Sequence, residues 1–158
     1  MNELQIHLFL NHVPILGALA ALLVVIIGVV TKNNAVRMSG LVVYIVMALA
    51  VIPTYLTGEG AEERIENIAG ISETVIESHE EMAELSLWIM LAAAAIGAAA
   101  LFTQWKGKSI AGTLSVVFVI VAIGAFIQIG LTGHEGGKIR RPDMTSGIAA
   151  PAAAEDND

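Results

Sequence analysis

Four long apolar runs dominate this chain and restrict it to very few folds. They cover residues 4–30, 39–56, 85–105 and 110–131. Each run is long enough to cross the hydrocarbon core of a bilayer, which takes about 20 residues of α-helix. Because backbone polar groups must be hydrogen-bonded inside hydrocarbon, each run is predicted to be helical. The sequence therefore predicts an integral membrane protein of the all-α class.

The composition agrees with a membrane location and excludes several kinds of chemistry. Hydrophobic residues make up 56% of the 158 residues and charged residues only 15%, whereas soluble domains carry about 25% charged residues. Cysteine is absent, which excludes disulfides, thiolate catalysis, covalent c-type haem attachment and cysteine-ligated iron–sulfur clusters. The net charge of −7 argues against nucleic acid as a partner. With no nucleophile–base motif in the chain, an enzyme acting alone is not expected.

The spacing of the runs predicts their arrangement. Short links join the first run to the second and the third to the fourth, so those pairs are expected to be antiparallel neighbours in an up-down-up-down four-helix bundle. Residues 1–142 would form this transmembrane domain, and residues 143–158 a disordered acidic tail. Residues 58–70, GEGAEERIENIAG, are predicted to form a short interfacial helix between spans two and three.

The basic residues suggest an orientation. Two of the links contain bases and no acids, and the positive-inside rule would place them in the cytoplasm of a bacterial inner membrane, with both termini outside. These bases are Lys32, Arg37, Lys106 and Lys108. An equal number lies on the opposite side: Arg64, Lys138, Arg140 and Arg141. The absence of basic residues before the first span favours termini outside.

All four histidines are expected at one end of the bundle. His7 and His12 open the first run, His79 precedes the third, and His134 follows the fourth. Imidazole is costly at a membrane border unless it has a partner, and it is the commonest side-chain ligand of haem iron and of transition metals. The histidines therefore predict a cofactor or metal site near the outer membrane face.

His79 is the strongest candidate because its helix separates polar from apolar residues cleanly. At 100° per residue, Ile76, Ala83 and Ser86 lie on the same face as His79. The glutamates fall on the opposite arc: Glu73, Glu77, Glu80, Glu81 and Glu84. His79 is therefore predicted to point into the bundle while the carboxylates face water. The alternative is an interfacial histidine bonded to a carbonyl group.

The first helix leaves the choice between its two histidines open. His7 begins a stripe of small and polar residues that is expected to face inward and continues through Asn11, Pro14, Ala18 and Ala21. His12 lies about 140° away from His7, so both imidazoles would not bind one iron without distortion. However, Pro14 removes a backbone hydrogen bond and can restart the helix, which would let His12 turn inward.

Three further residues are weaker candidates. His134 stands among Gly133, Gly136 and Gly137, which predict a helix end and a tight turn that could bring it to a cofactor or leave it in a solvated loop. Tyr55 and Glu59 close the second span at the same end and could serve as quinol or proton partners. They could equally be a membrane-border aromatic and a helix-end cap.

The opening HLFLNHVPI resembles a domain of unknown function found in small, four-span bacterial membrane proteins that begin with a pattern like HPxxVHFPI. The resemblance covers His7, His12 and Pro14, and the glycine pair Gly136 and Gly137 in GHEGGKI resembles the end of that family's last span. Leu8 and Val13 depart from the family's proline and phenylalanine. The resemblance implies a four-span membrane fold, to which cytochrome-b-like haem binding is commonly attached.

Three functions remain open on these residues. The first is a haem b-binding electron-transfer protein, with iron held between His79 and either His7 or His12, and with a quinol, a periplasmic carrier or a larger respiratory complex as partner. The second is a Zn²⁺ or Cu²⁺ site, built from His7 or His12, His79, His134 and either Glu59 or Glu80. The third is a structural or assembly subunit of a membrane complex, in which the histidines are only interfacial.

Overall fold

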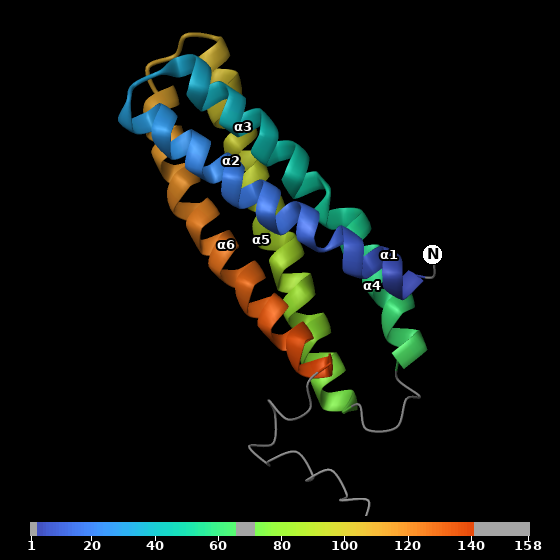
Figure 1. The fold of residues 1–158 in the computed structure, drawn as a ribbon. Coiled ribbons are helices and arrows are strands. Elements are labelled where there is room, and N and C mark those ends of the chain that lie inside the picture. The colour runs from blue at the N-terminus through green and yellow to red at the C-terminus, as the bar shows by residue number, and fades with distance from the viewer. Residues whose placement is uncertain (1–2, 66–71, 141–158) are drawn as a thin grey trace, which may run out of the picture.

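The computed structural model describes residues 3–65 and 72–140, and within them the chain is helical throughout apart from short turns (Figure 1). The helices there are α1 (Glu3–Leu10), α2 (His12–Val30), α3 (Asn34–Leu49), α4 (Val51–Ile65), α5 (Glu73–Trp105) and α6 (Ala111–Arg140). Because α1 continues into α2, and α3 into α4, four long apolar segments result. Each is long and apolar enough to cross a membrane: Gln5–Val30, Asn34–Glu63, Glu73–Trp105 and Ala111–Ile139. The predicted membrane four-helix bundle is confirmed.

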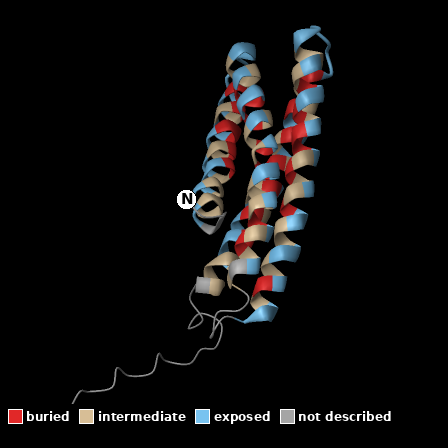
Figure 2. Cartoon of the chain, turned by 90° about the vertical axis from the view of Figure 1, so that its right-hand side faces the viewer, coloured by how far each residue is buried: buried red, intermediate tan, exposed pale blue. Residues whose placement is uncertain are grey.

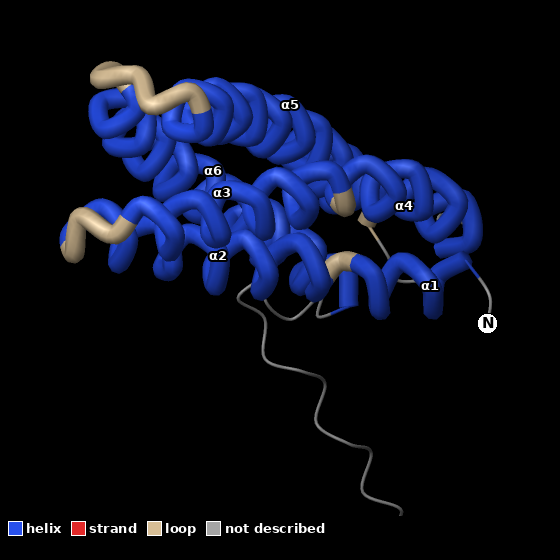
Figure 3. Tube along the Cα trace, turned by 90° about the horizontal axis from the view of Figure 1, so that it is seen from above, coloured by secondary structure: helices blue, strands red, loops and turns tan. Residues whose placement is uncertain are grey.

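The two interruptions of the spans have the same cause. The first lies at Asn11 and the second at Ala50, and in each case a proline follows three residues later, at Pro14 and Pro53. Proline has no N–H, so it leaves the carbonyl group four residues earlier without its helical donor. Viewed from above (Figure 3), α1 and α4 continue α2 and α3 beyond these breaks. The breaks therefore allow α1 and α4 to change direction and pack against each other.

Short turns join the helices at the end opposite to the predicted histidine site. Asn33 caps α3, its side-chain oxygen accepting from the backbone N–H groups of Ala35 at 3.1 Å and Val36 at 3.2 Å. Gly107 has a φ of 63° in the turn between α5 and α6, a conformation that glycine adopts without strain. These turns make α2 and α3, and α5 and α6, antiparallel neighbours.

The centre of the bundle is built from small residues around a few large ones. Tyr44 on α3 packs edge-on against Phe118 on α6, with 4.8 Å between ring centroids. Its hydroxyl donates to the sulfur of Met90 on α5 at 3.4 Å. Gly97 gives Phe118 room, because a Cβ there would lie 3.1 Å from the Phe118 ring. Small residues allow such close helix packing inside membranes.

The outer faces of the spans are apolar. Figure 2 shows buried residues as stripes on the inner sides of the helices and exposed residues on the outer sides. Large aliphatic side chains such as Leu16, Val30 and Ile120 are exposed there. A soluble protein rarely exposes contiguous apolar surface on this scale, whereas lipid chains solvate it without cost. The distribution therefore matches a bundle that is surrounded by lipid.

Two local predictions need correction. Residues 58–65 continue α4 as one helix from Val51, so the segment from Gly58 does not begin a separate interfacial helix; residues 66–70 lie outside the described residues. The glycines at 133, 136 and 137 do not end the last span, because α6 continues to Arg140. The tail predicted at 143–158 also lies outside the described residues.

Gly40 offers a test of the packing between α2 and α3. A Cβ on Gly40 would lie 2.7 Å from Val25 Cγ2 and 2.8 Å from the Val25 backbone nitrogen. We expect Gly40→Ala to destabilise the bundle by about 1–3 kcal/mol, because the two backbones must separate. Thermal unfolding in mild detergent measures this effect. Gly124→Ala is the matched control, since a Cβ there meets no described atom within 4 Å, and equal melting temperatures for the two variants would contradict the packing.

Candidate functional site

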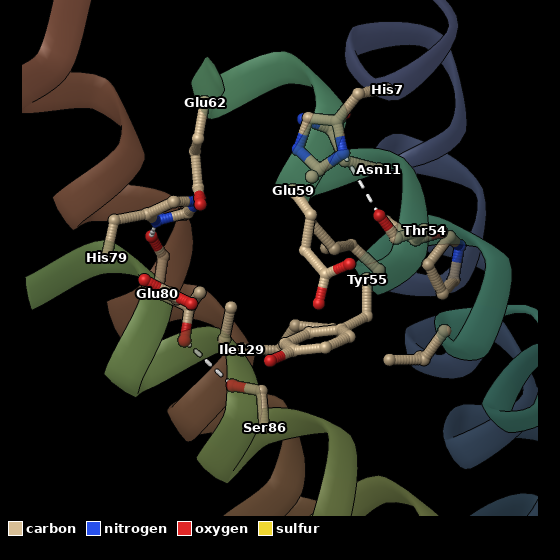
Figure 4. A pocket seen from close by; sticks show the side chains of 17 residues that line it. His7, Asn11, Thr54, Tyr55, Glu59, Glu62, His79, Glu80, Ser86 and Ile129 are labelled. Atoms are coloured by element: carbon tan, nitrogen blue, oxygen red, sulfur yellow. Dashed lines mark hydrogen bonds between the residues drawn. The ribbon is translucent and has the colours of Figure 1, made fainter. Parts of the chain in front are cut away.

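A cleft of about 90 Å³ lies between α1, the start of α2, α4, α5 and α6 at one end of the bundle (Figure 4). Its inner part is apolar and includes Pro14, Ile15, Val51, Ala83 and Ile129. Its other lining residues are mainly polar: His7, Asn11, Thr54, Tyr55, Gly58, Glu59, Glu62, His79, Glu80, Ser86, Thr132 and Gly133. The two helix breaks contribute Asn11 and Val51, so the bends that redirect α1 and α4 also shape this cleft.

His7 reaches the cleft from α1 and is anchored to α4. Its Nδ1 lies 3.0 Å from the backbone oxygen of Thr54 and 3.3 Å from the Thr57 hydroxyl. A carbonyl oxygen only accepts hydrogen bonds, so Nδ1 must carry the proton and donate it. A Cβ at Gly58 would lie 3.3 Å from Cε1 of the ring. Glycine at position 58 therefore leaves space for the imidazole against α4.

His79 repeats this arrangement on the other side of the cleft. Its Nδ1 lies 3.1 Å from the backbone oxygen of Thr132 on α6, so this nitrogen must also be the donor. A Cβ at Gly136 would lie only 2.9 Å from Cε1 of the ring. The Thr132 hydroxyl is held by α5, at 2.7 Å from Ser86 Oγ and 2.9 Å from the Met82 carbonyl oxygen. The carbonyl that anchors His79 is thus itself fixed between two helices.

These contacts determine the chemistry that both imidazoles offer. With Nδ1 protonated in a neutral ring, Nε2 keeps its lone pair and can accept a proton or bind a metal. Histidines that bind metals almost always donate their other ring N–H to a carbonyl or carboxylate, which fixes the ring orientation. His7 and His79 both have this anchoring and line one cleft. The arrangement therefore suits coordination by two imidazoles from different helices.

Asn11 adds a buried polar atom to the same cleft. Its side-chain oxygen is shielded from solvent and has no hydrogen-bond partner among the described residues. A buried acceptor without a partner costs roughly 1–3 kcal/mol. A bound group that supplies a donor, or a metal ion that accepts an oxygen ligand, would recover part of this cost. Asn11 lies on the stripe that the sequence predicts to face inward, together with His7 and the buried Pro14, Ala18 and Ala21.

His12 and His134 lie outside the cleft. Both side chains are exposed, and Nδ1 of His12 bonds the Leu8 carbonyl oxygen of its own turn at 3.0 Å. The helix does restart near Pro14, but this restart leaves His12 outside and His7 inside. His134 projects from α6 because the helix continues through its glycines and forms no turn there. The structure thus brings together two of the four predicted histidines.

Carboxyl and phenol groups surround the imidazoles. Tyr55, Glu59 and Glu80 line the cleft, as does Glu62, and Figure 4 shows Glu62 extending from α4 toward His79. Tyr55 and Glu59 therefore lie where the sequence predicts quinol or proton partners. All the glutamates predicted on the solvent side of α5 are exposed, including Glu80: Glu73, Glu77, Glu80, Glu81 and Glu84. No group of three or more His, Cys, Asp or Glu side chains within the described residues could hold a metal ion.

Four residues of the site gave no clear signal in the sequence. Thr54 and Thr132 supply the anchoring carbonyls, and Gly58 and Gly136 supply space beside the rings. In both cases the glycine follows the threonine by four residues, which places them on one face of a helix. The repeated T-x-x-x-G spacing in TYLTG and TGHEG is the pattern that could have indicated them.

Comparisons with family models, with curated proteins and with solved structures find no match to this chain. The resemblance of HLFLNHVPI to the four-span domain of unknown function therefore stays a prediction.

Proposed function

We propose that this chain is a membrane-embedded haem b protein in which the imidazoles of His7 and His79 would hold the iron. One observation carries the proposal: both imidazoles donate Nδ1–H to a threonine carbonyl of the adjacent helix and line the same cleft. This leaves two neutral Nε2 atoms as ligands, which is the set that suits a low-spin haem in a four-helix bundle.

The number of ligands favours haem over a bare metal ion. A porphyrin supplies four nitrogen ligands, so the protein needs to add only two. Structural zinc sites take four protein ligands and catalytic zinc sites take three. The described residues contain no suitable group of three, whereas two anchored imidazoles are present.

The size of the cleft requires a movement on binding. Sites for larger organic ligands enclose about 300–1,000 Å³, and this cleft encloses about 90 Å³. A porphyrin would therefore have to separate the α1–α4 pair from α5 and α6. The breaks at Asn11 and Ala50 are suitable pivots, because each proline removes a backbone hydrogen bond there.

The proposed role is one-electron transfer near one membrane face. Haem supplies the one-electron couple when it is bound, while the two imidazoles hold it and the apolar floor excludes water. Tyr55 and Glu59 would exchange protons with a quinol, and a periplasmic carrier or a larger respiratory complex would accept or deliver electrons. We place the chain in a bacterial inner membrane with both termini outside, following its basic loops. All histidines lie toward one end, so a further cofactor elsewhere would be needed for transfer across the membrane.

A transition-metal ion such as Zn²⁺ or Cu²⁺ is the second candidate. The small volume of the cleft and the carboxylates Glu59, Glu62 and Glu80 along it favour a small cation over a porphyrin with anionic propionates. Imidazole suits both metals. Under this alternative, a glutamate would have to move closer to complete the ligand set with His7 and His79.

Absorption spectra of the purified full chain test the proposal. The protein is expressed with ample haem supply, purified in mild detergent, and measured as a pyridine haemochrome and as a reduced-minus-oxidised difference spectrum. We expect the haem b absorbance change and about one haem per chain, as one pair of axial ligands predicts. Metal content is measured on the same sample. A colourless protein with bound zinc or copper would replace the first candidate by the second, and a protein with neither would contradict both.

A further inference from the structure

The end of the bundle opposite the histidines carries four basic residues, and the neighbouring sequence contains no acidic residue. Lys32, Arg37, Lys106 and Lys108 lie in or next to the turns at that end (Figure 1). Residues 4–58 and 85–134 contain no Asp or Glu. The four cations of this basic end therefore have no nearby carboxylate on their own helices or turns.

Arg37 is the most constrained of these cations. It lies in the first turn of α3 and is partly buried. Its Nη2 donates to Asn34 Oδ1 at 2.9 Å and to Gln104 Oε1 of α5. Its Nε is shielded from solvent and has no acceptor among the described residues. The guanidinium is thus held in place by neutral amides, and none of its described hydrogen bonds compensates its charge.

The backbone of Arg37 is also fixed. Gly28 of α2 packs so closely that a Cβ there would overlap the Arg37 backbone nitrogen and Cα. Contact with α2 thus fixes the backbone of Arg37, while Asn34 and Gln104 orient its guanidinium. An oriented guanidinium presents a planar fork of donors, a geometry that binds phosphate and carboxylate in a bidentate manner.

Aromatic residues place this arginine at the depth of the lipid headgroups. Gln104 precedes Trp105, which is exposed, and the Lys106 ammonium lies 4.3 Å from the Trp105 ring centroid. Phe102 lies on the same turn, 5.8 Å from Lys106. Tryptophan and lysine in this combination mark the border between hydrocarbon and headgroups. Arg37, bonded to Gln104, is therefore at the level where lipid phosphates lie.

We propose that Arg37 is the centre of a binding site for the phosphate of an anionic phospholipid. Lys32, Lys106 and Lys108 add positive charge around it, and the exposed aliphatic faces of the spans accommodate the acyl chains. Anionic headgroups are attracted to such juxtamembrane bases. This site is separate from the histidine cleft, so the proposal does not depend on haem or metal binding.

Thermal unfolding of the full chain in mixed micelles tests the site. Phosphatidylglycerol is compared with phosphatidylcholine of the same acyl chains, because only the first carries a net negative charge. We expect phosphatidylglycerol to raise the melting temperature by about 3–6 °C more than phosphatidylcholine, since a ligand that binds the folded state stabilises it. High salt should reduce the difference.

Two substitutions locate the effect. Arg37→Gln should abolish the advantage of phosphatidylglycerol, whereas Lys138→Gln, which removes one positive charge at the opposite end, should preserve it. Arg37→Lys keeps the charge without the fork and should retain only part of the advantage. Should Arg37→Gln fail to fold, the Arg37→Lys variant and the count of lipids retained by the wild-type protein in native mass spectrometry give the same comparison.

Three outcomes would overturn the proposal. Equal stabilisation by both lipids would remove the role of the headgroup charge. If Arg37→Gln and Lys138→Gln lost the same part of the phosphatidylglycerol advantage, the effect would be one of net charge in general. Equal stabilisation by inorganic phosphate at the same concentration would show a simple anion site in place of a lipid site.

Discussion

Replacing His79 by alanine is expected to lower the haem content of the purified protein at least tenfold. Even the residues that orient a metal ligand contribute roughly 10- to 100-fold to metal affinity, and this change removes the ligand itself. His7→Ala should have the same effect, because both imidazoles are anchored alike on opposite sides of one cleft. The haemochrome spectrum per mole of protein measures the loss, and metal content measured in parallel applies the same test to the zinc or copper alternative.

Two histidines provide matched controls for this result. His12 and His134 occupy the same end of the bundle but are exposed, so His12→Ala and His134→Ala should keep the wild-type haem content. If His12→Ala lost as much haem as His7→Ala, this would contradict the choice of His7 over His12 as the ligand from the first helix.

The conservative variant His79→Met adds a readout that a purely structural role would not affect. Methionine can serve as an axial ligand and raises the haem reduction potential. We therefore expect this variant to retain part of the haem, with a higher potential and an altered reduced spectrum. An unchanged potential would indicate that residue 79 is not an axial ligand.

Gly136→Val is expected to reduce haem content about tenfold while the bundle stays folded. A Cβ at this position would lie 2.9 Å from Cε1 and 3.2 Å from Nδ1 of His79. The branched side chain must therefore displace the ring from the Thr132 carbonyl oxygen, and loss of a hydrogen bond that orients a ligating imidazole typically costs roughly 10- to 100-fold in affinity. Haem content and melting temperature are measured together to separate loss of the site from loss of the fold.

The control for this substitution is the next residue of the same helix. Gly137→Val introduces the same side chain, but Gly137 does not line the cleft and a Cβ there meets no described atom within 4 Å. It should leave haem content unchanged. Gly58→Ala should have a milder effect than Gly136→Val, because its Cβ would lie 3.3 Å from the His7 ring. Equal haem losses in Gly136→Val and Gly137→Val would contradict the inference that Gly136 leaves space for the imidazole.

Hydropathy and helical periodicity were sufficient to predict the fold and the two helix faces that carry His7 and His79. The length of the apolar runs requires membrane-spanning helices, because hydrocarbon leaves no other way to bond the backbone. The inward orientation of His79 follows from helical periodicity, since the glutamates that share its helix occupy the water-facing arc and leave the opposite face for packing. The inward stripe from His7 to Ala21 was predicted from its small and polar residues, which are typical of helix interfaces inside membranes, and these residues are buried or line the cleft.

The choice between His7 and His12 depended on tertiary packing. Pro14 permits the helix to restart, but the new direction is set where α1 meets α4, and that contact turns His7 inward. The anchoring carbonyls and the roles of Gly58 and Gly136 also depend on tertiary packing. In the sequence, a glycine within a helix indicates only lower helix stability. Its role as space for an imidazole arises when a ring from another helix packs against it. Apolar length and charge are properties of one segment and are visible in it, whereas the partners of each imidazole belong to helices about 50 residues away and exist only once the bundle has formed.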